Sequence, residues 1–413
     1  MNPFRVLRRH RDFRIFWTGQ TLSLVGSWMQ TMAVGWLSLQ LSNSAFIVGL
    51  VASAGALPIV LLSMHAGAIV DRGDRFRYIR GTQAAFLILA VTLWLVTVSG
   101  HVSVPWLLGL MLLQGVASAI EIPARQAFII QLVGREDLQP AIALNSSGFN
   151  LARILGPAIG GLVIGRLGIA WCFALNAVSF VAVLWGLAHI RTGRAVADVK
   201  SPLSPPWRVL LASSTAGAMD GLRHLARPGP VRELLILVTV GALFGGPFLT
   251  LMPVVARDRL GLGAGGYGTL LASVGVGGFI GALLVAGPLA QRARKGVALI
   301  SAALLFPATL IVFAVTTNIV AAHLLLFAIG IAMIIFNALS NGVLQLLVDD
   351  AYRGRLMAFY SLVFIGISQA FGSFALGAAA RWFGSAAAIG TSAGILFVAS
   401  CYAWQRRDFW KHV

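Results

Sequence analysis

The feature that most limits the fold of this chain is a long segment without charge. Residues Ile15–Val70 contain no Asp, Glu, Lys or Arg. A helix needs about 20 apolar residues to cross a bilayer, and several further stretches exceed that length. Only 11% of the 413 residues are charged and 58% are hydrophobic, whereas a soluble domain has roughly a quarter charged residues. The sequence therefore predicts an all-α polytopic membrane protein.

The charge-free intervals predict twelve transmembrane helices. Three intervals are each long enough for two spans: Ile15–Val70, Gly81–Ile120 and Gly296–Val348. Single spans are expected at 141–165, 168–190, 234–256, 264–290, 356–380 and 384–405. The long polar segment between the sixth and seventh spans divides them equally. We therefore expect an N-terminal six-helix bundle (1–190), a cytoplasmic linker (191–232) and a C-terminal six-helix bundle (233–413).

The two halves also resemble each other in sequence. "AGAIVDR" (Ala66–Arg72) matches "AGPLAQR" (Ala286–Arg292) after the second and eighth spans. "QLVGREDLQPAIALNS" (Gln131–Ser146) matches "LLVDDAYRGRLMAFYS" (Leu346–Ser361) after the fourth and tenth. A six-span repeat predicts two pseudo-symmetric bundles, with a substrate site near the midplane between them.

The net charge of +18 has a topological explanation. Of 31 Lys and Arg residues, 26 fall in the N-terminus, the loops on one side of the predicted membrane and the C-terminus. The exceptions are Arg166, Arg257, Arg259 and Arg381 on the opposite side, and Arg153 within a span. Since positive loops face the cytoplasm, both termini are expected there. This scatter argues against nucleic acid as a partner, because nucleic-acid binding needs basic residues gathered on one surface.

No arrangement of residues predicts catalysis, a metal site or a bound cofactor. The seven histidines are scattered, without an H-E-x-x-H motif or a Ser/His/Asp set, and no Walker motif is present. The chain is therefore not expected to be an enzyme. Cys172 and Cys401 both lie in apolar runs and are expected to pack as small hydrophobic residues.

Two motifs resemble those of the major facilitator superfamily. In "AGAIVDRGDRFRYIR" (Ala66–Arg80), the residues that fit the family's loop between spans two and three, G-x-x-x-D-R-x-G-R-[RK], are Gly67, Asp71, Arg72 and Arg75. Asp74 replaces the family's second glycine. The helix-packing element G-P-x-x-G-G of the family's exporters is similar to Gly156, Pro157, Gly160 and Gly161 in span five.

The resemblance implies a fold and a function. "EIPARQAF" (Glu121–Phe128) and "RGRLMAFYSL" (353–362) are similar to the branch of enterobactin exporters and macrolide-efflux permeases. This implies the major facilitator fold and a monomeric, secondary-active exporter of an amphipathic drug or siderophore in the bacterial inner membrane. Transport would proceed by alternating access, driven by a proton gradient. Many proton-coupled members carry an arginine where this chain has Met111. This difference leaves open whether transport is coupled to protons.

The family loop further implies a cytoplasmic gate. Asp71 would meet a positive helix end or an arginine near Arg353 and Arg355, and Gly67 would permit close helix approach. Arg72 and Arg75 would face Glu121. We expect Asp71→Asn to lower transport with little loss of folded protein.

Glu121 and Arg125 are spaced for an ion pair on one helix face, although Pro123 between them favours a break. Glu121 is a candidate for a titrating carboxylate, and a permanently ionised gate residue is the alternative.

Polar groups inside the spans are candidates for coupling or substrate binding. Arg153 is a charged residue within a predicted span, and placing such a residue there costs about 2.5–3.5 kcal/mol of insertion free energy. It either contacts an anion or relays protons, or it is structural, snorkelling from a cytoplasmic end or pairing with Glu121. The amide candidates are Gln30, Gln114, Asn337, Asn341 and Gln345, which either line a cavity or join helices.

Two other functions remain open. The first is a lipid or lysolipid translocase on the same fold, since fold does not determine substrate. The second is a membrane sensor that transports nothing.

Overall fold

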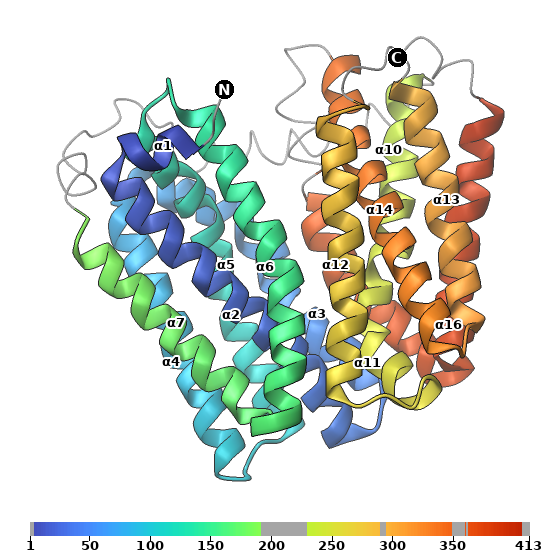
Figure 1. The fold of residues 1–413 in the computed structure, drawn as a ribbon, viewed down its shortest axis with the longest axis horizontal. Coiled ribbons are helices and arrows are strands. Elements are labelled where there is room, and N and C mark those ends of the chain that lie inside the picture. Colours follow the sequence, from blue (N-terminus) through green and yellow to red (C-terminus); the bar gives the residue numbers. More distant parts are fainter. Residues whose placement is uncertain (1–3, 191–228, 290–294, 349–359, 361, 407–413) are drawn as a thin grey trace. The chain divides into compact units, whose positions relative to one another are not determined.

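The computed structural model describes residues 4–190, 229–289, 295–348, 360 and 362–406, and within these ranges it is entirely helical (Figure 1). The chain divides into two compact units. The first contains Met1–Leu41 and Ala54–Leu211, and the second contains Ser42–Ser53 and Ala212–Val413. The expected linker 191–232 lies almost wholly outside the described residues, so its boundaries stay a prediction.

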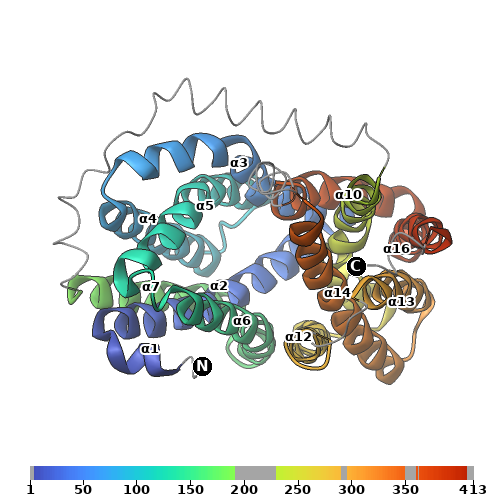
Figure 2. The ribbon, with the colours of Figure 1, turned by 90° about the horizontal axis from the view of Figure 1, so that it is seen from above.

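Among the described residues, the first unit contains seven helices, viewed along the bundle in Figure 2. They are α1 (Phe4–Arg9), α2 (Arg11–Ser42), α3 (Ala45–Arg72), α4 (Arg75–Val98), α5 (Val104–Val133), α6 (Leu138–Leu167) and α7 (Ala170–Ala188). α4 packs along both α5 and α7. Local signals end several of these helices: Gly134 and Gly168 follow α5 and α6 with φ of 71° and 95°, values that glycine adopts without strain.

The second unit begins with an irregular helical segment, Pro230–Arg259. It contains α10 (Pro230–Val240), a π-helical turn (Gly241–Gly245), a 3₁₀ stretch (Gly246–Leu251), α11 (Met252–Val254) and a second π-helical turn (Val255–Arg259). Pro247 and Pro253 explain part of this irregularity, because proline lacks the N–H that a regular helical bond requires.

Four longer helices follow among the described residues of the second unit. They are α12 (Ala264–Ala286), α13 (Lys295–Val315), α14 (Ile319–Leu347) and α16 (Ser373–Gln405), the last preceded by a π-helical segment, Leu362–Gly372. Glycine brings α12 and α14 together: a Cβ on Gly277 would collide with the backbone oxygen of Phe327, and one on Gly281 would lie 2.8 Å from that of Ile331. The G-x-x-x-G spacing of Gly277 and Gly281 therefore marks a close helix contact.

The turn between α2 and α3 belongs to the second unit. Asn43 adopts a positive φ of 50°, and its Oδ1 accepts a 2.7 Å hydrogen bond from Nη1 of Arg257. The Phe46 ring packs edge-on against that of Phe374, with centroids 5.6 Å apart. The segment "LSNSA" (Leu41–Ala45) therefore forms the turn between the two helices, and side chains more than 200 residues away hold it.

Ten segments of the described chain are long and apolar enough to cross a membrane, compared with the twelve expected. α2 is not among the ten, although its 32 residues give it a length of about 48 Å. The last two expected spans form one segment, Gly366–Gln405, which has 40 residues. Gly384, with φ 81° and ψ 159°, interrupts this segment at the predicted start of the twelfth span.

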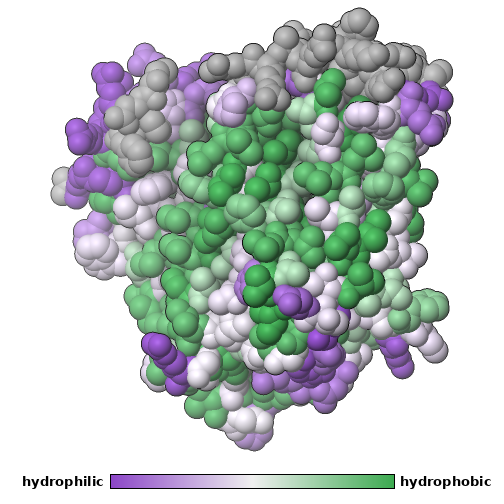
Figure 3. Space-filling model, turned by 45° about the vertical axis from the view of Figure 1, so that its right-hand side comes forward, coloured by the Kyte–Doolittle hydropathy of each residue, from purple (hydrophilic) through white to green (hydrophobic). Residues whose placement is uncertain are grey.

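Large apolar side chains cover much of the molecular surface, as Figure 3 shows for one face. Examples are Ile88, Val178 and Trp185, with exposed fractions of 64%, 64% and 67%. Exposure of this extent is unusual for a soluble protein but is expected where the side chains contact lipid. The surface and the span lengths together establish a multi-pass membrane protein.

Candidate functional site

A polar pocket of about 140 Å³ lies inside the first unit, among helices that are otherwise apolar. α2, α4, α5 and α7 all contribute to it. Its lining residues are Gln20, Ser23, Leu24, Ser27, Gln30, Gln83, Phe86, Gln114, Ser118, Glu121, Arg125, Asn176 and Phe180. Four of the predicted site residues, Gln30, Gln114, Glu121 and Arg125, therefore share one pocket.

A chain of hydrogen bonds crosses three helices at this pocket. Nε2 of Gln30 in α2 donates to Oε1 of Gln114 in α5 at 3.0 Å. Oε1 of Gln30 accepts a 2.8 Å bond from Nδ2 of Asn176 in α7, and Ser179 Oγ donates to the Asn176 carbonyl at 2.7 Å. Gln30 and Gln114 thus join helices, which was one of the two expected roles, and they also line the pocket.

Glu121 and Arg125 form the charged part of the pocket. Nε of Arg125 lies 3.0 Å from Oε1 of Glu121, and the exposed fractions of the side chains are 16% and 8%. The i, i+4 spacing therefore correctly predicted an ion pair. α5 continues through Pro123, so the expected break does not occur. Nε of Arg125 makes no aligned hydrogen bond, so the pair depends on charge more than on directed bonding.

Two glutamines in the pocket have an acceptor without a partner. Oε1 of Gln20 and Oε1 of Gln83 are buried and receive no hydrogen bond, while the residues are only 6% and 1% exposed. A buried acceptor without a donor is costly, so these atoms are ready to accept bonds from water or from a ligand.

The predicted gate is only partly described. α3 ends with Asp71 and Arg72, whose backbone is described but whose side chains are not. Arg353 and Arg355 lie wholly outside the described residues. Glu121 pairs with Arg125, and no ion pair joins it to Arg75 in the described part of the chain. Among described atoms, none lies within 4 Å of where a Cβ on Gly67 would be, and the segment expected to approach it lies outside the described residues, so the close helix approach there stays a prediction.

Asp74, which replaces a family glycine, has a structural role. It is the N-cap of α4, and its Oδ1 accepts hydrogen bonds from the backbone N–H groups of Phe76 at 2.9 Å and Arg77 at 3.2 Å. This satisfies two donors that a helix leaves free at its start. The departure from the family motif therefore stabilises the fourth helix at its first turn.

Arg153 lies in the middle of α6, partly buried. Its guanidinium carbon is 6.0 Å from the centroid of the Trp28 ring. The structural pairing with Glu121 that the sequence left open does not occur, because Glu121 pairs with Arg125.

The G-P-x-x-G-G element of α6 forms a close contact with α2. A Cβ on Gly156 would lie 2.5 Å from Cβ of Trp28, and one on Gly160 would lie 3.0 Å from Sδ of Met32. Pro157 and Gly161 are also buried, and α6 remains helical through Pro157. Helix packing, the role expected for this element, is what these glycines provide.

The amide stripe of α14 lies in the second unit. Nε2 of Gln345 donates to Oδ1 of Asn341 one turn earlier, and the backbone oxygen of Asn337 accepts a 3.2 Å bond from Tyr360 Oη. Gln345 is exposed, and Asn337 and Asn341 are partly buried. Whether this stripe lines a cavity stays a prediction.

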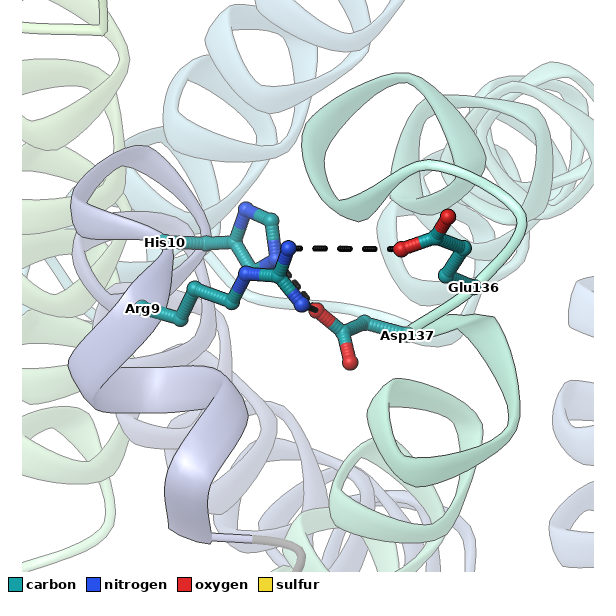
Figure 4. A network of polar contacts seen from close by, with 4 residues as sticks. All are labelled: Arg9, His10, Glu136 and Asp137. Carbon is teal, nitrogen blue, oxygen red and sulfur yellow. Dashed lines mark hydrogen bonds and ion pairs between the residues drawn. The ribbon is translucent and has the colours of Figure 1, made fainter.

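Sequence reasoning missed a charged cluster between α1 and the α5–α6 connection (Figure 4). Asp137 Oδ2 lies 2.8 Å from Nε2 of His10 and 3.0 Å from Nη1 of Arg9, and Glu136 is 4.0 Å from Arg9. The hydrogen bond with His10, supported by the charge of Arg9, holds the pKa of Asp137 below its usual value. The residues are about 127 positions apart, so no local pattern could indicate the cluster.

Comparison with known proteins gives a family match over nearly the whole chain. Residues 2–407 match the model of the transmembrane secretion effectors, MFS_3. The staphyloferrin A transporter of Staphylococcus aureus is 26% identical over 66% of this chain and 66% of its own. The enterobactin exporter EntS of Shigella flexneri is 29% identical over 70% of this chain and 66% of its own. The multidrug efflux pump Tap of Mycolicibacterium fortuitum is 30% identical over 62% of each chain. The matched part thus spans slightly less than two thirds of these relatives.

Solved transporters share the fold at much lower identity. A bacterial homologue of the human lysosomal transporter Spinster has a TM-score of 0.67 and 16% identity, covering 99% of this chain and 98% of its own. A POT family transporter in complex with 5-aminolevulinic acid has a TM-score of 0.74 and 11% identity, covering 96% of each chain.

Proposed function

Because this chain belongs to the transmembrane secretion effectors of the major facilitator superfamily, we propose that it is a proton-driven exporter of an amphipathic small molecule. In this proposal it works by alternating access, as a monomer in the inner membrane of a bacterium with both termini in the cytoplasm. Twelve spans follow if α2 crosses the membrane and Gly384 separates the last two. The siderophores and drugs in the names of its relatives define the substrate class to be tested first.

The observation that carries this proposal is the buried Glu121–Arg125 pair in the polar pocket. A proton reaching Glu121 would remove its charge and leave Arg125 without a counter-ion in a site of low dielectric. The unpaired guanidinium would then favour any conformation that gives it water or another anion. Proton entry would in this way shift the balance between conformations, and loss of the proton would restore the pair.

Purified protein in liposomes provides the test. We expect an imposed proton gradient to drive movement of a siderophore such as enterobactin, or of a drug-like dye, across the membrane. Glu121→Gln should remove the acceleration by the gradient, because a glutamine cannot take up the proton. Glu136→Gln is the matched control, since the Glu136 side chain is 88% exposed. Transport in Glu121→Gln that responds to the gradient as in the wild type would contradict the role of Glu121.

The same liposomes test the whole proposal. Failure of every siderophore and drug to move under any gradient would overturn export of small molecules. If labelled lysolipid moved instead, a lipid translocase would be the function.

A further inference from the structure

Arg153 carries a positive charge at the middle of a long membrane helix. It lies 15 residues after the first residue of α6 and 14 before the last, which places it roughly 20 Å from either end at a rise of about 1.5 Å per residue. An arginine side chain is too short to bring its head group to either end. Snorkelling from a cytoplasmic end, which the sequence left open, would therefore require the membrane surface to lie well inside α6.

The charge of Arg153 has no carboxylate to balance it. Among the residues that the structure describes, no Asp or Glu lies within ion-pair distance, and the contact of the guanidinium is with the Trp28 ring at 6.0 Å. A guanidinium remains protonated at any physiological pH. A cation–π contact offsets only part of the cost of placing it away from water, so the site is incomplete without an anion.

The surroundings of Arg153 are aromatic and firmly placed. Phe149, one turn earlier on α6, meets the Trp28 ring edge-on, with centroids 5.6 Å apart and planes at 75°. Gly156, one turn later, seats the α2 backbone: its Cβ would lie 2.5 Å from Cβ of Trp28 and 2.8 Å from the carbonyl oxygen of Val25. The base of the Trp28 side chain therefore lies against α6 at Gly156, and its ring lies against that of Phe149.

These three side chains are also accessible. Arg153 and Trp28 are partly buried, and Phe149 is 39% exposed. Arginines within membrane spans face the interior of the bundle or a water-filled cavity and not hydrocarbon, so this side of α6 faces water, protein or a ligand.

We propose that Arg153, Trp28 and Phe149 form a substrate subsite for aromatic organic anions. The carboxylate or phenolate of the ligand pairs with the guanidinium of Arg153, and its ring packs against Trp28 and Phe149. This inference rests on the proposed function, because it assigns the site to the exported molecule. It also predicts selectivity: an anion should bind well, whereas a cation of the same shape should be repelled.

Three probes of one shape and different charge test this selectivity. They are 1-naphthoate, the neutral 1-naphthalenemethanol and the cation 1-naphthylmethylammonium. Calorimetry on the full chain in phosphatidylcholine nanodiscs should show naphthoate binding at least about tenfold more tightly than the alcohol, with the cation weakest. Equal affinity for the anion and the alcohol would overturn the proposal.

Substitutions then assign the effect to residues. Arg153→Gln should reduce naphthoate affinity to that of the alcohol, while Trp28→Leu should weaken both probes by a similar factor. Arg166→Gln is the control, because Arg166 is exposed on the same helix and should change nothing. If Arg153→Gln does not fold, Arg153→Lys tests the assignment instead. A lysine keeps the positive charge, so this variant should keep the preference for the anion. A loss of that preference in a folded Arg153→Lys, or its survival in Arg153→Gln, would contradict the assignment.

Anionic lipid is the other possible source of a negative group. Repeating the titration in nanodiscs that contain phosphatidylglycerol distinguishes the two: naphthoate affinity should be unchanged, and its loss would show that a lipid headgroup occupies the site. None of these measurements uses a gradient. Selective binding without transport would support the subsite and contradict the proposed function. Transport without selective binding would support the proposed function and contradict the subsite.

Discussion

Nδ2 of Asn176 in α7 lies 2.8 Å from Oε1 of Gln30 in α2, and this bond joins two membrane helices through buried side chains. Asn176 is 1% exposed and Gln30 is 4% exposed. Both side chains of this bond are therefore almost fully buried.

Replacing Asn176 with leucine should destabilise the protein by about 1–2 kcal/mol, since Gln30 would keep a buried acceptor without its donor. Thermal unfolding in detergent micelles, followed by circular dichroism, measures the change. Asn150→Leu is the matched control, because Nδ2 of Asn150 bonds only to the Ser146 carbonyl of its own helix and should matter far less. Equal melting temperatures for the two variants would contradict the role of the inter-helix bond.

Gly277→Ala should destabilise the second unit by about 1–3 kcal/mol through overpacking. Its new methyl group would collide with the backbone of Phe327, which cannot move aside as a flexible side chain would. Gly342→Ala in α14 is the control: its Cβ would meet nothing within 4 Å, so only the small gain in helix propensity remains. Unfolding by denaturant compares the two, and a stable Gly277→Ala would show that α12 and α14 tolerate a wider separation.

Asp74→Ala should cost about 1 kcal/mol, because two backbone donors at the start of α4 lose their acceptor. Asp74→Asn should retain most of the stability, since an asparagine side chain caps a helix equally well. If both variants lost transport but kept their stability, Asp74 would act in the gate instead of as a cap.

Asp137 should stabilise the folded chain most above the pH range in which a free aspartate titrates. The pKa of Asp137 is lowered in the folded chain, by His10 first and by Arg9 in addition. Its contribution is therefore fully present above the unfolded value of about 4 and is lost as the pH falls through the lower folded pKa. We expect Asp137→Asn to lower the melting temperature at pH 5–7, with the difference from wild type shrinking as the pH falls below about 4.

Glu136→Gln is the control for that measurement, since Glu136 is exposed and lies 4.0 Å from Arg9. A difference between Asp137→Asn and wild type that grows as the pH falls would have the opposite sign and would contradict the assignment.

Sequence and structure agree best where the pattern is local. Glu121 and Arg125 pair because four residues make about one helical turn, and Gly277 and Gly281 contact a neighbour because their spacing places both on one face. The cap at Asp74 was also visible in principle, as an aspartate directly before a helix.

The part of the candidate site that the sequence could not predict depends on how each helix is rotated about its axis. Gln83 and Asn176 join Gln30 in the pocket only because α4 and α7 turn those positions inward, and uniformly apolar spans carry no pattern that records the rotation. The boundary between the last two spans is a similar case. One positive φ, at Gly384, separates two segments that are continuous in hydropathy and in helical hydrogen bonding.

The glycine contact between α12 and α14 has a thermodynamic consequence. Gly277 and Gly281 face α14, and a Cβ on Gly330 of α14 would lie 2.9 Å from the backbone nitrogen of Gly278, so part of this contact is backbone against backbone. Side chains with rotatable bonds lose conformational freedom when helices meet, and they regain it when helices part. Glycine has no such freedom to lose. Where backbone meets backbone, the two helices can therefore approach and separate with little change in side-chain entropy, and dispersion forces hold that part of the contact.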